Sequence, residues 1–255
     1  MHPPPPRAAA PRGFTLPELL VGLAIGLAVL TTALTLWHST RSLWLGFVAQ
    51  QQLQHNARRA FDVIDQQAHL AGAATLLGVA GSTGLTPSAA YGDSDPEVRA
   101  TDGAAAGDTL SLGHWRSVDP TDCQGNSGTS GTSAALVLSQ FQRSTTTTHD
   151  FACKDARAIG STFQALAEGA EDLQIQLAEV SADGLRVQWK TPSQVTQWSQ
   201  VQAIEVCLRW VSRLPVAASD VGVIGCNGER IAGDGHVRQV MRRTIALRQR
   251  SGASP

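Results

Sequence analysis

Residues 12–37 read RGFTLPELLVGLAIGLAVLTTALTLW, and this stretch decides the architecture of the N-terminal part of the chain. Between Phe14 and Trp37 the only ionisable residue is Glu18. About 20 apolar residues suffice for a helix to cross a bilayer, so this segment predicts a membrane-spanning helix. Two arginines precede the segment, which favours a cytoplasmic N-terminal end and places the rest of the chain across the membrane.

A secretory signal peptide is the main alternative for an apolar segment near an N-terminus. Its apolar core is shorter, and a cleavage site with small residues follows that core. Here the apolar run is too long, and the sequence WHSTR at 37–41 is a poor cleavage site. The unusual residues stand at the start of the run instead, where Gly13 and Phe14 precede Glu18.

Glu18 needs a positively charged partner if it enters the membrane. A lone carboxylate in a bilayer costs several kcal/mol unless it is paired. If the chain were cut after Gly13, the new amino terminus at Phe14 would lie one helical turn from Glu18. In a bundle of such helices, the terminal amine of one subunit would then neutralise the carboxylate of its neighbour.

The sequence Gly13-Phe14-Thr15-Leu16-x-Glu18, followed by Leu-Leu-Val, resembles the prepilin leader and helix start of type IV pilins and type II secretion pseudopilins. The resemblance implies that a prepilin peptidase cleaves between Gly13 and Phe14. It also implies N-methylation of Phe14 and a role for Glu18 in assembly. The leader MHPPPPRAAAPR departs from the usual short basic leader, but the departure touches neither Gly13 nor Glu18.

The helix is predicted to continue beyond the membrane and to end at Gly72. Apolar residues recur three or four positions apart and form one face: Leu53, Ala57, Phe61, Ile64, Ala68 and Ala71. Glutamines, arginines and aspartates occupy the other faces, and glycine is a typical helix stop. From residue 14 to residue 71 such a helix would be about 87 Å long. Its second half would lie against a globular head.

After Gly72 the composition shifts to small and polar residues. Polar runs at 125–133 and 145–148 are typical of loops, whereas 109–112 and 135–141 are typical of strands. The region 73–160 is therefore predicted to be variable and rich in loops.

Apolar and polar residues then alternate in four segments, which predicts an antiparallel sheet. These segments are 170–177, 185–189, 201–211 and 237–247. The predicted fold class is α+β, with a long N-terminal helix packed against a C-terminal antiparallel sheet, as in pilins. The chain would comprise a leader (1–13), a transmembrane helix (14–37), a periplasmic helix continuation (38–72), a loop-rich region (73–160) and the sheet of the head (161–255).

The order of these features resembles the minor pilin PilW family. The resemblance rests on Leu70-Ala71-Gly72 at the helix end, on the segment 166–174, on 201–208 and on 243–248. Pseudopilin J proteins of type II secretion have related shapes. The cysteines and the long middle region rich in Ser, Thr and Gly favour the pilus.

All four cysteines follow the predicted membrane span: Cys123, Cys153, Cys207 and Cys226. Four cysteines permit three connectivities. Pairing of sequence neighbours closes the smaller loops, which favours Cys123–Cys153 and Cys207–Cys226. The chain has no C-x-x-C pair, so disulfides are favoured over a zinc site. Disulfides also suit an oxidising periplasm.

Composition and motifs argue against several other functions. Lys plus Arg is 20 and Asp plus Glu is 21, a net charge of −1, whereas nucleic-acid-binding domains are usually strongly basic. The sequence contains no G-x-S-x-G elbow, no P-loop and no H-E-x-x-H motif. We therefore expect no enzyme activity, no cofactor, no metal site and no direct binding of nucleic acid.

The resemblance implies a minor pilin that helps to initiate type IV pilus assembly in a priming or tip complex, and that supports adhesion or twitching motility. The expected partners are other minor pilins and the major pilin, a prepilin peptidase, the inner-membrane assembly platform and a tip adhesin. The protein would span the bacterial inner membrane once, with a periplasmic head, and join the surface pilus after assembly. The alternatives are a type II secretion pseudopilin and a signal-anchored periplasmic binding module.

Overall fold

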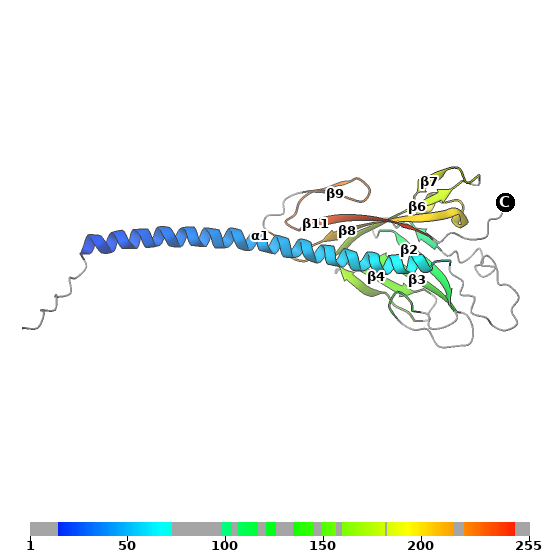
Figure 1. Ribbon diagram of the computed structural model, residues 1–255, viewed down its shortest axis with the longest axis horizontal. Coiled ribbons are helices and arrows are strands. Elements are labelled where there is room, and N and C mark those ends of the chain that lie inside the picture. Colours follow the sequence, from blue (N-terminus) through cyan, green and yellow to red (C-terminus); the bar gives the residue numbers. More distant parts are fainter. Residues whose placement is uncertain are drawn as a thin grey trace, which may run out of the picture. The chain divides into compact units, whose positions relative to one another are not determined.

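The computed structural model describes residues 15–72, 98–103, 107–116, 121–125, 135–144, 149–156, 160–181, 183–216 and 222–247. The chain divides into two compact units, the first ending at Leu45 and the second beginning at Gly46 (Figure 1). The two polar runs predicted as loops, apart from Gly125, lie outside the described residues.

Helix α1 (Leu16–Leu70) is 55 residues long and is shared by the two units. Pro17 lies in its first turn, where a missing N–H costs little. The helix ends at Leu70, and Gly72, two residues later, has a φ of 76° and donates its N–H to the carbonyl oxygen of Gly113 at 3.1 Å. Glycine adopts this left-handed conformation without steric cost, so the predicted stop is confirmed.

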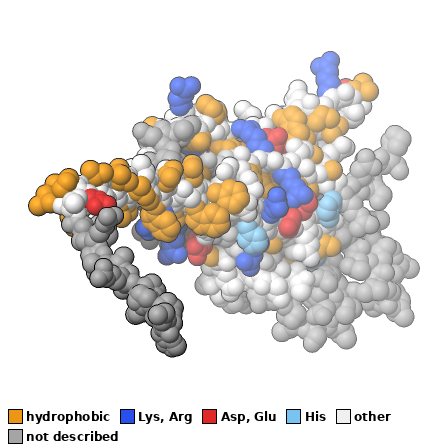
Figure 2. Space-filling view, turned by 60° about the vertical axis from the view of Figure 1, so that its left-hand side comes forward, with side chains coloured by type: hydrophobic (Ala, Val, Ile, Leu, Met, Phe, Trp, Pro, Cys, Tyr) orange, Lys and Arg blue, Asp and Glu red, His pale blue; other side chains and the backbone are white. Residues whose placement is uncertain are grey.

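The two parts of α1 have different surfaces. Up to Leu45 nearly every side chain is exposed, and Figure 2 shows hydrophobic side chains in orange along the N-terminal end of the helix. In the second unit, the six residues predicted to form one apolar face are all buried. The 3.6-residue period therefore identified the side of the helix that packs against the head.

The head contains a five-stranded antiparallel sheet in which neighbouring strands are also consecutive in sequence. Its strands are β1 (Val98–Thr101), β2 (Thr109–Arg116), β3 (Ala135–Arg143), β4 (Asp150–Asp155) and β5 (Gln164–Glu168). The strands predicted at 109–112 and 135–141 lie in β2 and β3, whereas β1 and β4 were not predicted within the region 73–160. Serine, threonine and glutamine alternate with buried apolar residues here. The polar overall composition of the region therefore did not by itself indicate that it contains strands.

A second antiparallel sheet has the strand order β11–β8–β6–β7. Its strands are β6 (Ala170–Val180), β7 (Val187–Lys190), β8 (Val201–Val211) and β11 (Arg238–Ala246). These are the four strands that the sequence predicted, and the β6–β7 hairpin turns through Asp183 and Gly184. Two 3₁₀ helices, η1 (Pro192–Gln194) and η2 (Trp198–Gln200), precede β8. A small hairpin, β9 (Val223–Ile224) with β10 (Arg230–Ile231), precedes β11.

Gly169 is the one residue between β5 and β6, where the chain passes from the first sheet to the second. Its φ is 89°, and a Cβ atom there would lie 2.6 Å from the carbonyl oxygen of Val211. Its own carbonyl accepts the N–H of Val211 at 2.8 Å. A side chain at this position would therefore clash with β8, so glycine is required.

One apolar core joins the second half of α1 to both sheets, and Figure 1 shows this part of the helix running alongside their strands. Two polar contacts fix the helix against the first sheet. Asn56 donates to the carbonyl oxygen of Glu168 at 2.9 Å, and the buried Gln67 side chain accepts from the Ser139 hydroxyl at 3.0 Å. These bonds satisfy polar groups that would otherwise be costly to bury.

Candidate functional site

Glu18 lies in the first turn of α1 with its side chain exposed. The hydroxyl of Thr15 donates to Glu18 Oε2 at 3.5 Å, a long bond that leaves most of the carboxylate unsatisfied. Within the described residues no cation pairs with Glu18. Gly13 and Phe14, the predicted cleavage and methylation residues, lie outside the described residues.

Glu18 shares a side of the helix with two glycines. Gly22 and Gly26 follow it at intervals of four residues, which places all three along one face of α1. A Cβ atom added at either glycine would meet nothing within 4 Å in the described chain. Small residues at this spacing let a second helix approach closely. A neighbouring helix seated on the glycines would therefore bring its own N-terminal groups near the carboxylate.

The hydroxyl side chains of the apolar segment are satisfied within the helix itself. Thr31, Thr32 and Thr35 each donate to the carbonyl oxygen three residues earlier, at 2.8–2.9 Å. Ser39 and Ser42 do the same at 3.0 and 2.9 Å. Polar groups in a hydrocarbon environment need internal partners, and these hydroxyls have them.

By length and composition α1 can cross a membrane, and no residue of its most apolar window is buried within the chain. Exposed apolar side chains continue beyond Trp37, the predicted end of the span, at Leu43, Trp44 and Leu45. Arg41 interrupts them. The exposed apolar surface of the helix is therefore longer than a membrane crossing requires.

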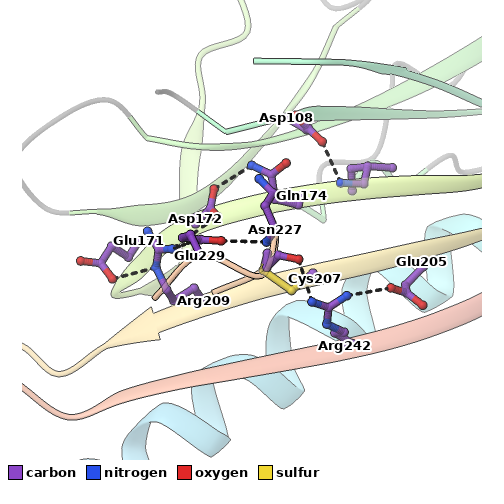
Figure 3. Close-up of a disulfide and its surroundings, with 12 residues drawn as sticks. Asp108, Glu171, Asp172, Gln174, Glu205, Cys207, Arg209, Asn227, Glu229 and Arg242 are labelled. Atoms are coloured by element: carbon purple, nitrogen blue, oxygen red, sulfur yellow. Dashed lines mark hydrogen bonds and ion pairs between the residues drawn. A yellow bond between two sulfur atoms is a disulfide. The ribbon is translucent and has the colours of Figure 1, made fainter. Parts of the chain in front are cut away.

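The head contains two disulfides, Cys123–Cys153 and Cys207–Cys226, and these are the pairs that the sequence favoured. Cys153 lies in β4, and its bridge ties the five-stranded sheet to the segment before β3. Cys207 lies in β8, and its bridge holds the loop between β9 and β10 (Figure 3). Disulfides persist in oxidising compartments, which agrees with an exported head.

A network of charged side chains lies beside the second disulfide, and sequence reasoning did not detect it. Glu171 accepts from Arg238 at 2.9 and 3.0 Å and from Arg209 at 2.9 Å. Arg209 also donates to Glu229 of the loop between β9 and β10 at 2.5 Å (Figure 3). Burial raises the pKa of Glu171, but the two arginines outweigh burial and hold the pKa below its ordinary value. The partners are 38 and 67 residues from Glu171, so no local pattern reveals them.

A second carboxylate, Glu179 at the end of β6, fixes the segment between β7 and β8. It accepts from Lys190 at 2.8 Å, from the Thr196 hydroxyl at 2.7 Å and from the N–H groups of Thr196 and Gln197. Its side chain is only 7% exposed. Burial raises the pKa of Glu179, but the bonds from Lys190 and Thr196 outweigh it and lower the pKa to about 2.

Glu179 is therefore expected to make stability depend on pH. Because its pKa is lower in the folded state than the ordinary 4.5, its contribution is present above pH 4.5 and is lost as the pH falls toward 2. We expect Glu179→Gln to lower the free energy of unfolding by about 2 kcal/mol at pH 7 and by much less at pH 2.5. Thermal unfolding of the full chain in detergent measures this. Glu168→Gln, on an exposed side chain, is the control, and an equal loss at both pH values would refute the assignment.

Among the residues that the structure describes, no three His, Cys, Asp or Glu side chains form a group that could hold a metal ion. The polar groups described above act through fixed hydrogen bonds and ion pairs within the head. Helix α1 exposes one carboxylate, a glycine face and a long apolar surface. They are suited to packing against other helices.

Comparison with known proteins gave three findings. Residues 10–34 match the model of the prokaryotic N-terminal methylation motif. No curated protein sequence matched the chain. A solved type IV-like pilin, TTHA1219 from Thermus thermophilus, is similar over 77% of this chain and 95% of its own, with 11% identity and a TM-score of 0.48.

The matched motif contains Gly13, Phe14 and Glu18, the three residues that the sequence singled out. The motif implies processing by a prepilin peptidase and assembly with other pilins. The apolar helix that follows it implies anchoring in the inner membrane before incorporation into a pilus. Residues 10–34 of the chain therefore carry the prokaryotic N-terminal methylation motif, at the start of a helix that can cross a membrane.

Proposed function

We propose that this protein is a minor pilin of the PilW family that helps to initiate type IV pilus assembly in a priming or tip complex. The observation that carries the proposal is the Glu18 carboxylate within the methylation motif, at the start of an exposed apolar helix, which pairs with no cation among the described residues. Outside a membrane, the apolar surface of such a helix is covered only when other helices pack around it. The head sequence at 166–174 and 201–208, together with its two disulfides, supports the finer assignment to the PilW family.

In this function the protein acts in two stages. The helix first anchors it in the inner membrane, with Arg41 and the head on the periplasmic side. Cleavage between Gly13 and Phe14 then exposes the Phe14 amine, which becomes methylated and pairs with Glu18 of an adjacent subunit. The other minor pilins, the major pilin, the assembly platform and a tip adhesin are the proposed partners.

Processing provides the first test. We expect the N-terminus of the membrane-bound protein to be methylated Phe14, as measured by intact-mass and peptide mass spectrometry. Gly13→Ala should be processed, at a normal or reduced rate, whereas Gly13→Leu should retain the full leader because a bulky side chain does not fit beside the scissile bond. A strain without the prepilin peptidase is the control. An intact Met1 start in peptidase-positive cells would contradict the proposal.

A type II secretion pseudopilin carries the same N-terminal motif and is the second candidate. Deletion of the gene distinguishes the two systems. Loss of surface pili with normal secretion supports the minor pilin, whereas loss of secretion with normal pili supports the pseudopilin. A head that binds a ligand while the helix never joins other pilins would instead indicate a signal-anchored binding module.

A further inference from the structure

An open groove of about 560 Å³ lies along β11, the edge strand of the second sheet. Its lining comes from two elements of the head unit. Helix α1 contributes Arg58, Phe61 and Asp62, and β11 contributes Met241, Arg242 and Arg243. The groove therefore borders both a helix face and a sheet edge.

The backbone of β11 is paired on one side only. Two backbone hydrogen bonds just beyond the ends of β11 show which of its residues bond to β8: Ser212 N–H donates to Val237 O, and Leu247 N–H donates to Gln202 O. The odd-numbered residues of β11 therefore direct their N–H and C=O groups toward β8. In an antiparallel ladder the alternate residues then direct their N–H and C=O groups outward. These outward residues are Arg238, Val240, Arg242, Thr244 and Ala246. In the described part of the chain no strand pairs with this outer edge.

The side chains beside the edge have a defined chemistry. Arg243 points toward the helix, where it lies 3.5 Å from Asp62 and 3.4 Å from Asp65. Met241 lies on the same side of β11 and lines the groove together with Phe61. Arg58 is exposed, and no acidic side chain of the described residues pairs with it. Arg242 pairs with Glu205 at 3.3 Å and Arg243 with the two aspartates, so Arg58 is the lining cation that has no acidic partner among the described residues. An extended segment with a carboxylate opposite Arg58 and an apolar side chain beside Met241 therefore complements the groove.

We propose that the outer edge of β11 binds an extended, acidic segment of another pilin-like subunit, which adds to the second sheet as a fifth strand. Main-chain hydrogen bonds to the outward residues of β11 supply affinity. Alternate side chains of the added strand point to the helix side and contact Arg58 and Met241, which supplies specificity. This inference rests on the proposed function, because it assigns a surface for one of the subunits that the helix brings together.

A second copy of this chain fits the groove poorly. If two β11 strands paired antiparallel through their outward residues, Arg242 of one copy would lie opposite Arg242 of the other in one register and opposite Arg238 in another. Like charges directly opposite each other destabilise a sheet. Charged residues on an edge strand also prevent unspecific pairing. These registers of self-pairing are therefore disfavoured, whereas Arg58 favours a partner strand that carries an acidic side chain.

Photo-crosslinking in cells tests the inference on the full-length chain. A photoreactive amino acid at position 244, on the outward edge, is expected to crosslink to an acidic, extended segment of another protein that carries the N-terminal methylation motif. The same residue at position 187 on β7, the opposite edge of the sheet, is the positional control. Peptide mass spectrometry identifies the crosslinked segment.

Arg58→Glu in the same background is expected to lower the yield of this crosslink roughly tenfold, because it places a negative charge against the acidic segment. Arg59→Glu is the matched control, since Arg59 is the next residue of α1, is equally exposed and does not line the groove. It should leave the yield unchanged. Exchange of the acidic residue in the crosslinked segment for lysine should restore binding to the Arg58→Glu chain.

A crosslink to a second copy of this chain, to a helix, or to no protein would overturn the inference. Equal yields for the Arg58 and Arg59 variants would also overturn it. Co-purification with other pilins is measured in the same extracts and reports on the proposed function separately. If co-purification persists without the crosslink, only the β11 surface is refuted. If both are lost, the proposed function fails as well.

Discussion

Replacement of Glu18 by alanine is expected to leave the protein expressed, inserted in the membrane and cleaved after Gly13, but to reduce the number of surface pili by about tenfold or more. Glu18 lies near the start of the helix, so insertion does not depend on it. In the proposed assembled state the terminal amine of a neighbour would supply the positive charge, in a low-dielectric environment. Removal of one partner of a buried ion pair typically costs roughly 3–5 kcal/mol, because the other charge is stranded.

Electron microscopy of surface pili and co-purification with the other pilins measure the effect. Glu18→Gln tests whether the charge of Glu18 or its hydrogen bonding is needed for assembly. We expect it to reduce the number of surface pili almost as much as Glu18→Ala does. Thr15→Ala is the matched control, because it removes only the long hydroxyl contact to Glu18 and should assemble normally. A Glu18→Ala protein that is processed and still supports normal pilus numbers would show that the carboxylate has no role in packing.

The second large effect is expected from removing the Cys123–Cys153 disulfide. This bridge closes a loop of 30 residues that contains β3, the central strand of the five-stranded sheet. On the chain-entropy model the double change to serine should lower the free energy of unfolding by roughly 3–4 kcal/mol. Both sulfur atoms belong to buried residues, so two polar hydroxyls in the core would add to the loss.

Chemical denaturation of the full chain in detergent, with and without reductant, measures this loss. Reductant should destabilise the wild type strongly and the double variant only through Cys207–Cys226. Arg213→Ala is the control, because the pair Arg213–Glu168 is exposed on both sides and contributes little. Free thiols at positions 123 and 153 in protein isolated from the periplasmic side would contradict the prediction.

Local sequence patterns identified the helix and strands whose formation depends mainly on residues close together in sequence. The apolar face of α1, its stop at Gly72, and strands β6, β7, β8 and β11 all follow from periodicity and from the conformational freedom of glycine. The five-stranded sheet was underestimated because threonine, serine and glutamine occupy the partly buried positions of β2 and β3. Leu110, Leu112 and Phe141 carried the strand signal among them, and all three are fully buried.

The contacts that organise the head surface were not accessible to sequence reasoning. Glu171 meets Arg209 and Arg238 only because β6, β8 and β11 are neighbours in the sheet. The groove exists because one face of the helix passes the free edge of the last strand. Both features depend on strand order, which a single sequence does not encode in any local pattern. Glu18, in contrast, was identifiable because a charge within an apolar run stands out without any tertiary information.

The internal bonds of Thr31, Thr32 and Thr35 have a mechanical consequence. Each hydroxyl keeps its acceptor whether lipid chains or neighbouring helices surround α1, so no hydrogen bond must break when one environment replaces the other. The free-energy difference between helix α1 in lipid and helix α1 among other helices is then set by side-chain packing and by the Glu18 charge. In the proposed function, these three hydroxyls would therefore add no hydrogen-bonding cost when the helix leaves the bilayer for a filament.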